Sequence, residues 1–245
     1  MDSTAILLAI AGAFMLAGLV KGVVGLGLPT VAIGLLGLLM TPTQAAAVLV
    51  LPALITNVWQ AAAGSNLMPL AQRLWPMLVG ICIGTVIGTS YLPSGREATV
   101  WLGLALLIYS GLGLIRMEFS VSPHAERWLN LPMGLLTGAV TAATGVYVLP
   151  GTPYLHALQF DRHRLVQALG ISFTVSTLAL GATLAQAGEM NTALAIPSLV
   201  ALAASLVGMR LGQLVRGMVR SETFRLCFFL GLFVLGAHLA LRGLL

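Results

Sequence analysis

The sequence contains very little charge. Only 12 Lys and Arg and 7 Asp and Glu occur among 245 residues, which is 8%, whereas soluble domains carry about 25% charged residues. So few charged side chains cannot cover the surface of a soluble protein of this length. A surface that faces lipid has to be apolar, so the hydrophobic content of 58% predicts an all-α integral membrane protein that crosses the bilayer several times.

Groups that would support catalysis or metal binding are also scarce. The two cysteines, Cys82 and Cys227, lie inside apolar runs and lack the spacing of a zinc site. The only aspartates are Asp2 and Asp161, and both fall outside the apolar segments. Hydrolase, zinc-protease and phosphate-loop motifs do not occur. We therefore expect no enzyme, no metal and no cofactor, and transport driven by ATP hydrolysis in this chain is disfavoured.

The net charge of +5 comes from basic residues scattered among apolar stretches. They form no patch with interleaved aromatic residues, so we expect no nucleic-acid partner. Basic residues of membrane proteins gather in cytoplasmic loops. The 162–164 loop and the region of Arg216, Arg220 and Arg225 are separated by two expected spans and therefore lie on the same, cytoplasmic side. The C-terminus is then predicted outside, although Arg242 lies there.

Eight hydrophobic units divide the chain, and a spanning helix needs about 20 apolar residues. They cover residues 4–40, 43–63, 74–92, 98–115, 129–158, 165–187, 192–215 and 223–244. As one helix, unit 4–40 would be roughly 55 Å long, against a hydrocarbon core of about 30 Å. Glycine and proline disfavour a continuous helix, so we predict breaks or re-entrant turns near Gly25 to Pro29 and near Gly145 to Pro153.

Matching residue pairs predict two tandem repeats. Gly18, Gln44 and Gly84 in the first half correspond to Gly134, Gln167 and Gly208 in the second. The predicted organisation is a first membrane repeat over 1–116, a linker loop over 117–128 and a second membrane repeat over 129–245. Each repeat opens with a broken unit and continues with three spans. One crossing per broken unit gives eight spans and parallel repeats, and two crossings give ten spans and inverted repeats; the sequence leaves both open.

The segments from Gly18 to Pro29 and from Gly134 to Pro150 resemble the sulfite exporter TauE/SafE family of membrane permeases. That family shows a Gly-rich, Pro-containing motif near the start of each half, and its second half continues with a short charged loop and a new span, here residues 160–173. The resemblance covers essentially the whole chain. It implies a carrier for sulfite or small organosulfonate anions.

Candidate substrate-binding groups lie at the breaks and within the spans. A broken membrane helix presents free N–H groups and the positive end of a helix dipole to a protected cavity, which suits a small anion. Lys21 could pair with that anion, titrate, or snorkel to the interface. The alternatives for the other residues are helix packing by glycine and interhelical hydrogen bonding by polar side chains. The predicted site contains Lys21, Gly22, Gly25, Gly27, Asn57, Thr141, Thr144, Gly145 and Ser172.

The expected function is secondary transport of a small anion, sulfite or an organosulfonate, by alternating access between the two repeats. An anion channel, an intramembrane enzyme and a membrane protein without transport activity are the alternatives. His156 and His163 are candidates for proton coupling, because histidine titrates near neutral pH. Sodium coupling and a homo-oligomer stay open. We expect a multi-pass protein of the inner (plasma) membrane, in which the two breaks face each other near mid-membrane.

Overall fold

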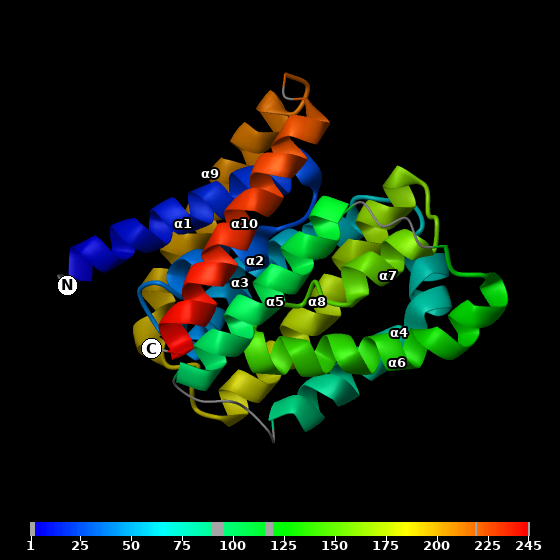
Figure 1. The fold of residues 1–245 in the computed structure, drawn as a ribbon, viewed down its shortest axis with the longest axis horizontal. Coiled ribbons are helices and arrows are strands. Elements are labelled where there is room, and N and C mark those ends of the chain that lie inside the picture. The colour runs from blue at the N-terminus through cyan, green and yellow to red at the C-terminus, as the bar shows by residue number, and fades with distance from the viewer. Residues whose placement is uncertain (1–2, 90–95, 116–119, 219, 245) are drawn as a thin grey trace.

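The computed structural model describes residues 3–89, 96–115, 120–218 and 220–244, and this part of the chain is helical and contains no strand (Figure 1). The α-helices are α1 (Ser3–Val24), α2 (Leu28–Leu36), α3 (Pro42–Ala62), α4 (Leu67–Thr89), α5 (Arg96–Ile115), α6 (Pro123–Thr144), α7 (Gly151–Ala157), α8 (Arg162–Gln186), α9 (Ala195–Val215) and α10 (Ser221–Leu244). A 3-10 turn over Thr192–Leu194 precedes α9. Seven of these helices, all but α2, α6 and α7, are long and apolar enough to cross a membrane. The predicted all-α membrane class is confirmed.

The first over-long unit is interrupted where the sequence predicts it. Gly25 and Gly27, between α1 and α2, have φ of 87° and 101°, in the left-handed region that favours glycine. The N–H of Gly25 caps α1 by donating to the carbonyl oxygen of Lys21 at 2.7 Å. Pro29 follows in the first turn of α2, where its missing N–H removes no helical hydrogen bond. The predicted break near Gly25 to Pro29 is confirmed.

The second over-long unit is broken in the same way, and its chain then doubles back. Gly145 has φ of 72° and donates to the carbonyl of Thr141 at 2.8 Å, which ends α6. Residues 146–150 are irregular before α7. At the far end of α7, the Ala157 carbonyl accepts a hydrogen bond from the N–H of Val121, just before α6, at 2.9 Å. The unit therefore returns to the end of the molecule from which α6 starts, and the predicted break near Gly145 is confirmed.

Two helices begin earlier than the charge pattern suggests. α4 includes Arg73, which was expected in a loop, and α6 starts at Pro123, inside the expected 117–128 linker. Ser122 accepts the N–H of Ala125 at 3.3 Å and caps α6, with Pro123 in the first turn. Their charged residues led us to predict loops in these two stretches. Arg73 instead pairs with Glu126, and both residues lie within helices. Residues 117–119 lie outside the described residues.

Helices of the first half pack on helices of the second half. α1 packs against α9, and α4 against α6. Glycines permit the close approach: a Cβ built on Gly84 would lie 2.1 Å from the Leu135 carbonyl oxygen, and one on Gly208 would lie 2.1 Å from that of Met15. In the middle, α3 crosses α8, and α5 runs beside α10 (Figure 1).

These reciprocal contacts bear on the predicted repeat. They align Met15 with Leu135, and the capping glycines Gly25 and Gly145 then align as well. In this alignment Gly18 corresponds to Gly138, one helical turn from the Gly134 that the sequence comparison matched with it. Both halves show the order of a long helix, a short helix and three long helices. The duplication itself stays a prediction.

One end of the helix bundle is rich in arginine. There the Gln167 side chain donates to the Gly64 carbonyl at 2.8 Å and joins the α3–α4 turn to α8. Burial lowers the pKa of Arg216, and the nearby Arg162 lowers it further, so the α9–α10 turn lies at the same end. We call this the basic end; it carries Arg73, Arg127, Arg162, Arg164, Arg216, Arg220 and Arg225.

The opposite end holds the turn between α2 and α3, the start of α5 and the end of α10. A Cβ on Gly243 would lie 3.0 Å from the Arg96 carbonyl oxygen, which brings the last two of these together. α1 runs parallel to α9 and so begins at this end, and α2 leads back to it. This path favours the alternative in which each broken unit crosses and returns, as inverted repeats require.

Candidate functional site

Lys21 lies in the last turn of α1, directly before the first break, and is only 4% exposed. Its ammonium donates to Thr56 Oγ1 at 3.1 Å and to Asn57 Oδ1, both on α3. The side chain is therefore buried between helices, and the snorkelling alternative is wrong. No carboxylate of the described residues lies within ion-pair distance of it.

Asn57 extends this contact to the second half of the chain. Its Nδ2 donates to the hydroxyl of Tyr147, in the second break, at 3.3 Å and to Thr177 Oγ1, on α8, at 3.4 Å. The Tyr147 ring packs on Phe173, with 5.1 Å between ring centroids. We call Lys21, Thr56, Asn57, Tyr147 and Thr177 the central network. It joins the flank of one break to the other break.

A further contact brings the second break against α2. A Cβ built on Gly145 would lie 2.6 Å from Ile33 Cδ1 and 3.2 Å from the Cβ of Ala46 on α3. The second break therefore packs on α2, the helix that follows the first break. The structure brings the two breaks together around buried side chains.

Several buried donors near these elements have no partner among the described residues. The hydroxyls of Thr152, Ser172 and Ser176 are buried and make no hydrogen bond. A buried hydroxyl without a partner costs about 1–3 kcal/mol, so such groups indicate a site for water or a ligand. Ser172 and Ser176 are one turn apart and share a face of α8, and α7, the helix of Thr152, also contacts α8.

Backbone donors are also available, but not at every predicted glycine. Gly25 and Gly145 use their N–H groups to cap α1 and α6. Within the described chain, no hydrogen bond engages the N–H groups of Leu26, Gly27, Leu28, Tyr147, Val148 and Leu149. Of the predicted glycines, Gly27 is thus the one that keeps a free donor.

Three other predicted residues have structural roles here. A Cβ on Gly22 would lie 2.3 Å from the Met209 carbonyl oxygen, so this glycine serves the packing of α1 on α9. The Thr141 hydroxyl donates to the Thr137 carbonyl at 2.6 Å, and the Thr144 hydroxyl donates to that of Val140 at 2.7 Å. Both hydroxyl protons are therefore used in hydrogen bonds within α6. Neither hydroxyl can donate to a bound anion in this arrangement.

The comparison with protein families decides the class of the molecule. The model of the family described as Sulfite exporter TauE/SafE matches residues 10–239, which include Lys21 and both breaks. The chain belongs to this family. No match was found among curated proteins or among solved structures. The resemblance predicted from the Gly18 and Gly134 segments is confirmed. The protein is a multi-pass membrane permease, and its family supports a function in transport.

The two histidines that were candidates for coupling in this TauE/SafE protein are not joined to the central network by a hydrogen bond between described residues. His156 on α7 and His163 in the first turn of α8 have exposed side chains. No hydrogen bond between described residues connects either imidazole with Lys21. The backbone N–H groups of Arg164 and His163 donate to the Asp161 carboxylate at 3.0 Å each; these bonds lower the pKa of Asp161 and cap α8.

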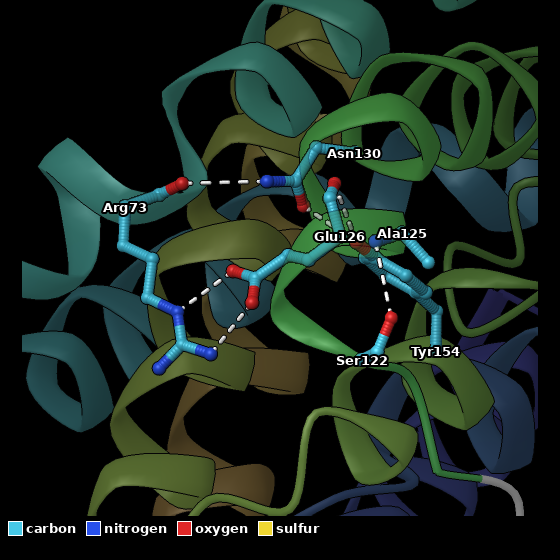
Figure 2. A network of polar contacts seen from close by, with 6 residues as sticks. All are labelled: Arg73, Ser122, Ala125, Glu126, Asn130 and Tyr154. Carbon is cyan, nitrogen blue, oxygen red and sulfur yellow. Dashed lines mark hydrogen bonds and ion pairs between the residues drawn. The ribbon is translucent and has the colours of Figure 1, made fainter.

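An ion-pair network at the basic end fixes the limb after the second break, and sequence reasoning missed it. Arg73 Nε and Nη2 each donate to one carboxylate oxygen of Glu126 at 2.7 Å (Figure 2). The Tyr154 hydroxyl of α7 donates to Asn130 Oδ1 at 2.8 Å, and Asn130 reaches the Arg73 carbonyl at 3.4 Å. The guanidinium lies 4.6 Å from the Phe160 ring centroid. The network ties α4, α6 and α7 together.

Tyr147 and the network of Arg73 with Glu126 share one reason for having been missed. Each depends on contacts between residues more than 50 positions apart, which no local spacing reveals. Ser176 and Thr177 are polar side chains of an expected span, and Ser176 follows the predicted Ser172 by one helical turn.

Proposed function

We propose that this TauE/SafE protein is a secondary transporter that binds a small oxyanion, sulfite or an organosulfonate, beside Lys21. The observation that carries the proposal is a buried ammonium whose hydrogen-bond partners, Thr56 and Asn57, are both neutral. The sulfur chemistry of the substrate is supported by the family description.

A charge taken out of water costs several kcal/mol unless an opposite charge accompanies it. An ammonium has three N–H donors, and Thr56 and Asn57 accept from Lys21, so one donor is left. An oxyanion would supply the missing charge and accept this donor. The hydroxyls of Ser172 and Ser176, which have no partner among the described residues, are further donors on α8, the helix that carries Thr177 of the central network. Charge and donors thus both suit an anion.

Alternating access suits the positions of the cavities, which open at the two ends of the molecule and leave its centre closed. A cavity of about 950 Å³ opens at the end that holds Arg242, and one of about 560 Å³ opens beside Arg73 at the basic end. The central network lies between helices of both halves and is buried. A channel would need a continuous pore. Movement of one half against the other about the glycine breaks would open the centre to each side in turn.

The remaining parts of the proposal concern setting and partners. The basic end faces the cytoplasm by the positive-inside rule, and the protein resides in the inner (plasma) membrane. Transport is coupled to protons or sodium, with His156 and His163 at the basic end as groups that a proton could use. The protein is not an enzyme, and it works alone or as a homo-oligomer.

Counterflow in proteoliposomes tests this function. Liposomes loaded with unlabelled sulfite should accumulate ³⁵S-sulfite saturably with the wild-type protein. Lys21→Gln should reduce this uptake by about tenfold or more, as expected when a charged partner of the substrate is lost. Arg210→Gln, which removes an exposed charge on α9, is the matched control and should transport normally. Normal saturable uptake by Lys21→Gln would overturn the site, and uptake without saturation or counterflow would establish the channel instead.

A further inference from the structure

The larger cavity, at the end opposite the basic end, is unusual in what lines it. Its volume is about 950 Å³, and its walls come from the α2–α3 turn, the start of α5 and the end of α10. Its polar lining residues are Thr41, Gln44, Arg96, Thr99, His238 and Arg242. No Asp or Glu is among the described residues that line it. The cavity therefore gathers positive charge and hydrogen-bonding groups.

The two arginines of this cavity lie on the side where arginine is disfavoured. Membrane proteins concentrate Lys and Arg in cytoplasmic loops, and most arginines of this chain follow that rule at the basic end. Arg96 begins α5 and Arg242 lies in the last turn of α10, far apart in the sequence, yet both line the same cavity. Two guanidinium groups from distant parts of the sequence therefore contribute to the lining of one cavity.

The groups around the cavity are held in place. Arg242 Nη1 donates to the Leu38 carbonyl at 2.8 Å, which orients a guanidinium that has five N–H donors in all. Thr41 and Gln44 form a capping box: the Thr41 hydroxyl accepts the N–H of Gln44 at 3.3 Å, and Gln44 Oε1 accepts that of Thr41 at 3.2 Å. Because the Gln44 oxygen is used, its amide nitrogen is the group left to donate to a ligand.

We infer that this cavity is a second oxyanion-binding site, separate from Lys21. The fork of a guanidinium matches the oxygens of sulfite, a sulfonate or a phosphate, and a bidentate contact adds geometric selectivity. Two sources share this chemistry: the small anion on its way through the outer opening, and the phosphate of a lipid headgroup at the membrane surface. The site holds an oxyanion whether or not Lys21 binds one.

The test uses the purified full-length protein and two probes. In the first arm, equilibrium dialysis with ³⁵S-sulfite compares wild type with an Arg96→Gln/Arg242→Gln double variant. A matched double variant, Arg210→Gln/Arg220→Gln, removes the same charge elsewhere. In the second arm, native mass spectrometry counts the phosphatidylglycerol that each protein retains. An Arg96→Lys/Arg242→Lys variant, which keeps the charge, reports whether loss of binding follows charge or misfolding.

Sulfite binding that persists in the Lys21→Gln protein is assigned to this cavity. The Arg96→Gln/Arg242→Gln variant should weaken that binding by about tenfold or more, while the matched variant should leave it unchanged. A second outcome also supports the inference: sulfite binding is unchanged, but the Arg96→Gln/Arg242→Gln variant alone loses a retained phosphatidylglycerol. The site would then hold a lipid phosphate. If neither probe distinguishes the double variant from the matched one, the inference is wrong. Failure of the proposed function has a different signature, because it appears as normal uptake by Lys21→Gln.

Discussion

Lys21 is the only lysine among the 12 Lys and Arg residues of the chain. The other basic positions use arginine, whose planar guanidinium suits interfaces and surface ion pairs. The ammonium of Lys21 lies between α1 and α3, where it donates to the side chains of Thr56 and Asn57 and keeps one N–H donor. At the scale of single residues, the choice of lysine therefore points to the buried site.

This singular position permits a direct measurement on Lys21. Reductive methylation followed by peptide mass spectrometry reports one lysine side chain without interference from others. Methanesulfonate, which unlike sulfite does not react with the formaldehyde of the reagent, should slow methylation of Lys21 when bound beside the amine, because it occupies the remaining N–H direction and excludes the reagent. Chloride at equal ionic strength is the control and should have little effect. Equal rates in the two salts would contradict an anion site at this residue.

The pair of Arg73 and Glu126 gives a second prediction at this scale. Glu126 is 6% exposed, and Glu126→Gln leaves the exposed Arg73 without its charge partner. We expect a loss of about 1–3 kcal/mol in the free energy of unfolding, moderated by the exposed guanidinium. Arg73→Gln/Glu126→Gln should lose less than the two single changes together, since the residues interact. Additive losses in thermal unfolding would show that the pair contributes nothing.

At the scale of elements, the breaks combine a helix cap with a change of direction. Gly25 and Gly145 both have positive φ, but their surroundings differ. A Cβ on Gly25 would meet only Val166 at 3.6 Å, whereas one on Gly145 would collide with Ile33. The first break therefore tolerates a side chain sterically, and only the backbone conformation opposes it.

This difference predicts a graded effect of alanine. Gly25→Ala should cost about 1–2 kcal/mol for the left-handed backbone, and Gly145→Ala should cost more because steric overlap adds to the same strain. Gly111→Ala, in α5 with no atom within 4 Å of the added Cβ, is the control and should be neutral or stabilising. Thermal unfolding of the three purified variants checks this order. Equal losses at positions 25 and 145 would contradict it.

The elements also show how far sequence reasoning reaches. Length against the thickness of a bilayer predicted both breaks within a few residues. Apolar runs predicted eight hydrophobic units and eight to ten spans, and seven helices of the described residues are long and apolar enough to cross a membrane. The start of α6 was hidden, because Glu126 and Arg127 look like loop residues until the partner of Glu126 on α4 is known. In the site, Lys21 and Asn57 were predicted and are in contact, whereas Tyr147 could be assigned only once the second break was seen to fold onto α3.

At the scale of the whole molecule, helices of each half have their main packing partners in the other half. α1 has its main partner in α9, and α4 has its main partner in α6. The glycine-lined faces of these helices bring backbones into contact, as in other close membrane helix pairs. Neither half covers these faces by itself.

Separate expression of the halves tests this packing. Residues 1–116 and 117–245, made as two chains in the same cell, should assemble, co-purify and restore sulfite uptake. Each half made alone should be degraded, since its glycine faces stay uncovered. As a control, Gly84→Leu in the first half should prevent co-purification, because the built Cβ already lies 2.1 Å from Leu135. Stable, monodisperse single halves would show that packing between the halves is dispensable.

The pairing of α1 with α9 also sets an order of assembly during synthesis. α4 and α6 emerge close together and can associate early. α1 is complete at Val24, but α9 ends only at Val215. At 5–20 residues per second this leaves α1 in the bilayer without its partner for roughly 10 to 40 s. The nascent chain should therefore assemble from its middle outward, and its first helix, the one that carries Lys21, is the one that waits longest for a partner.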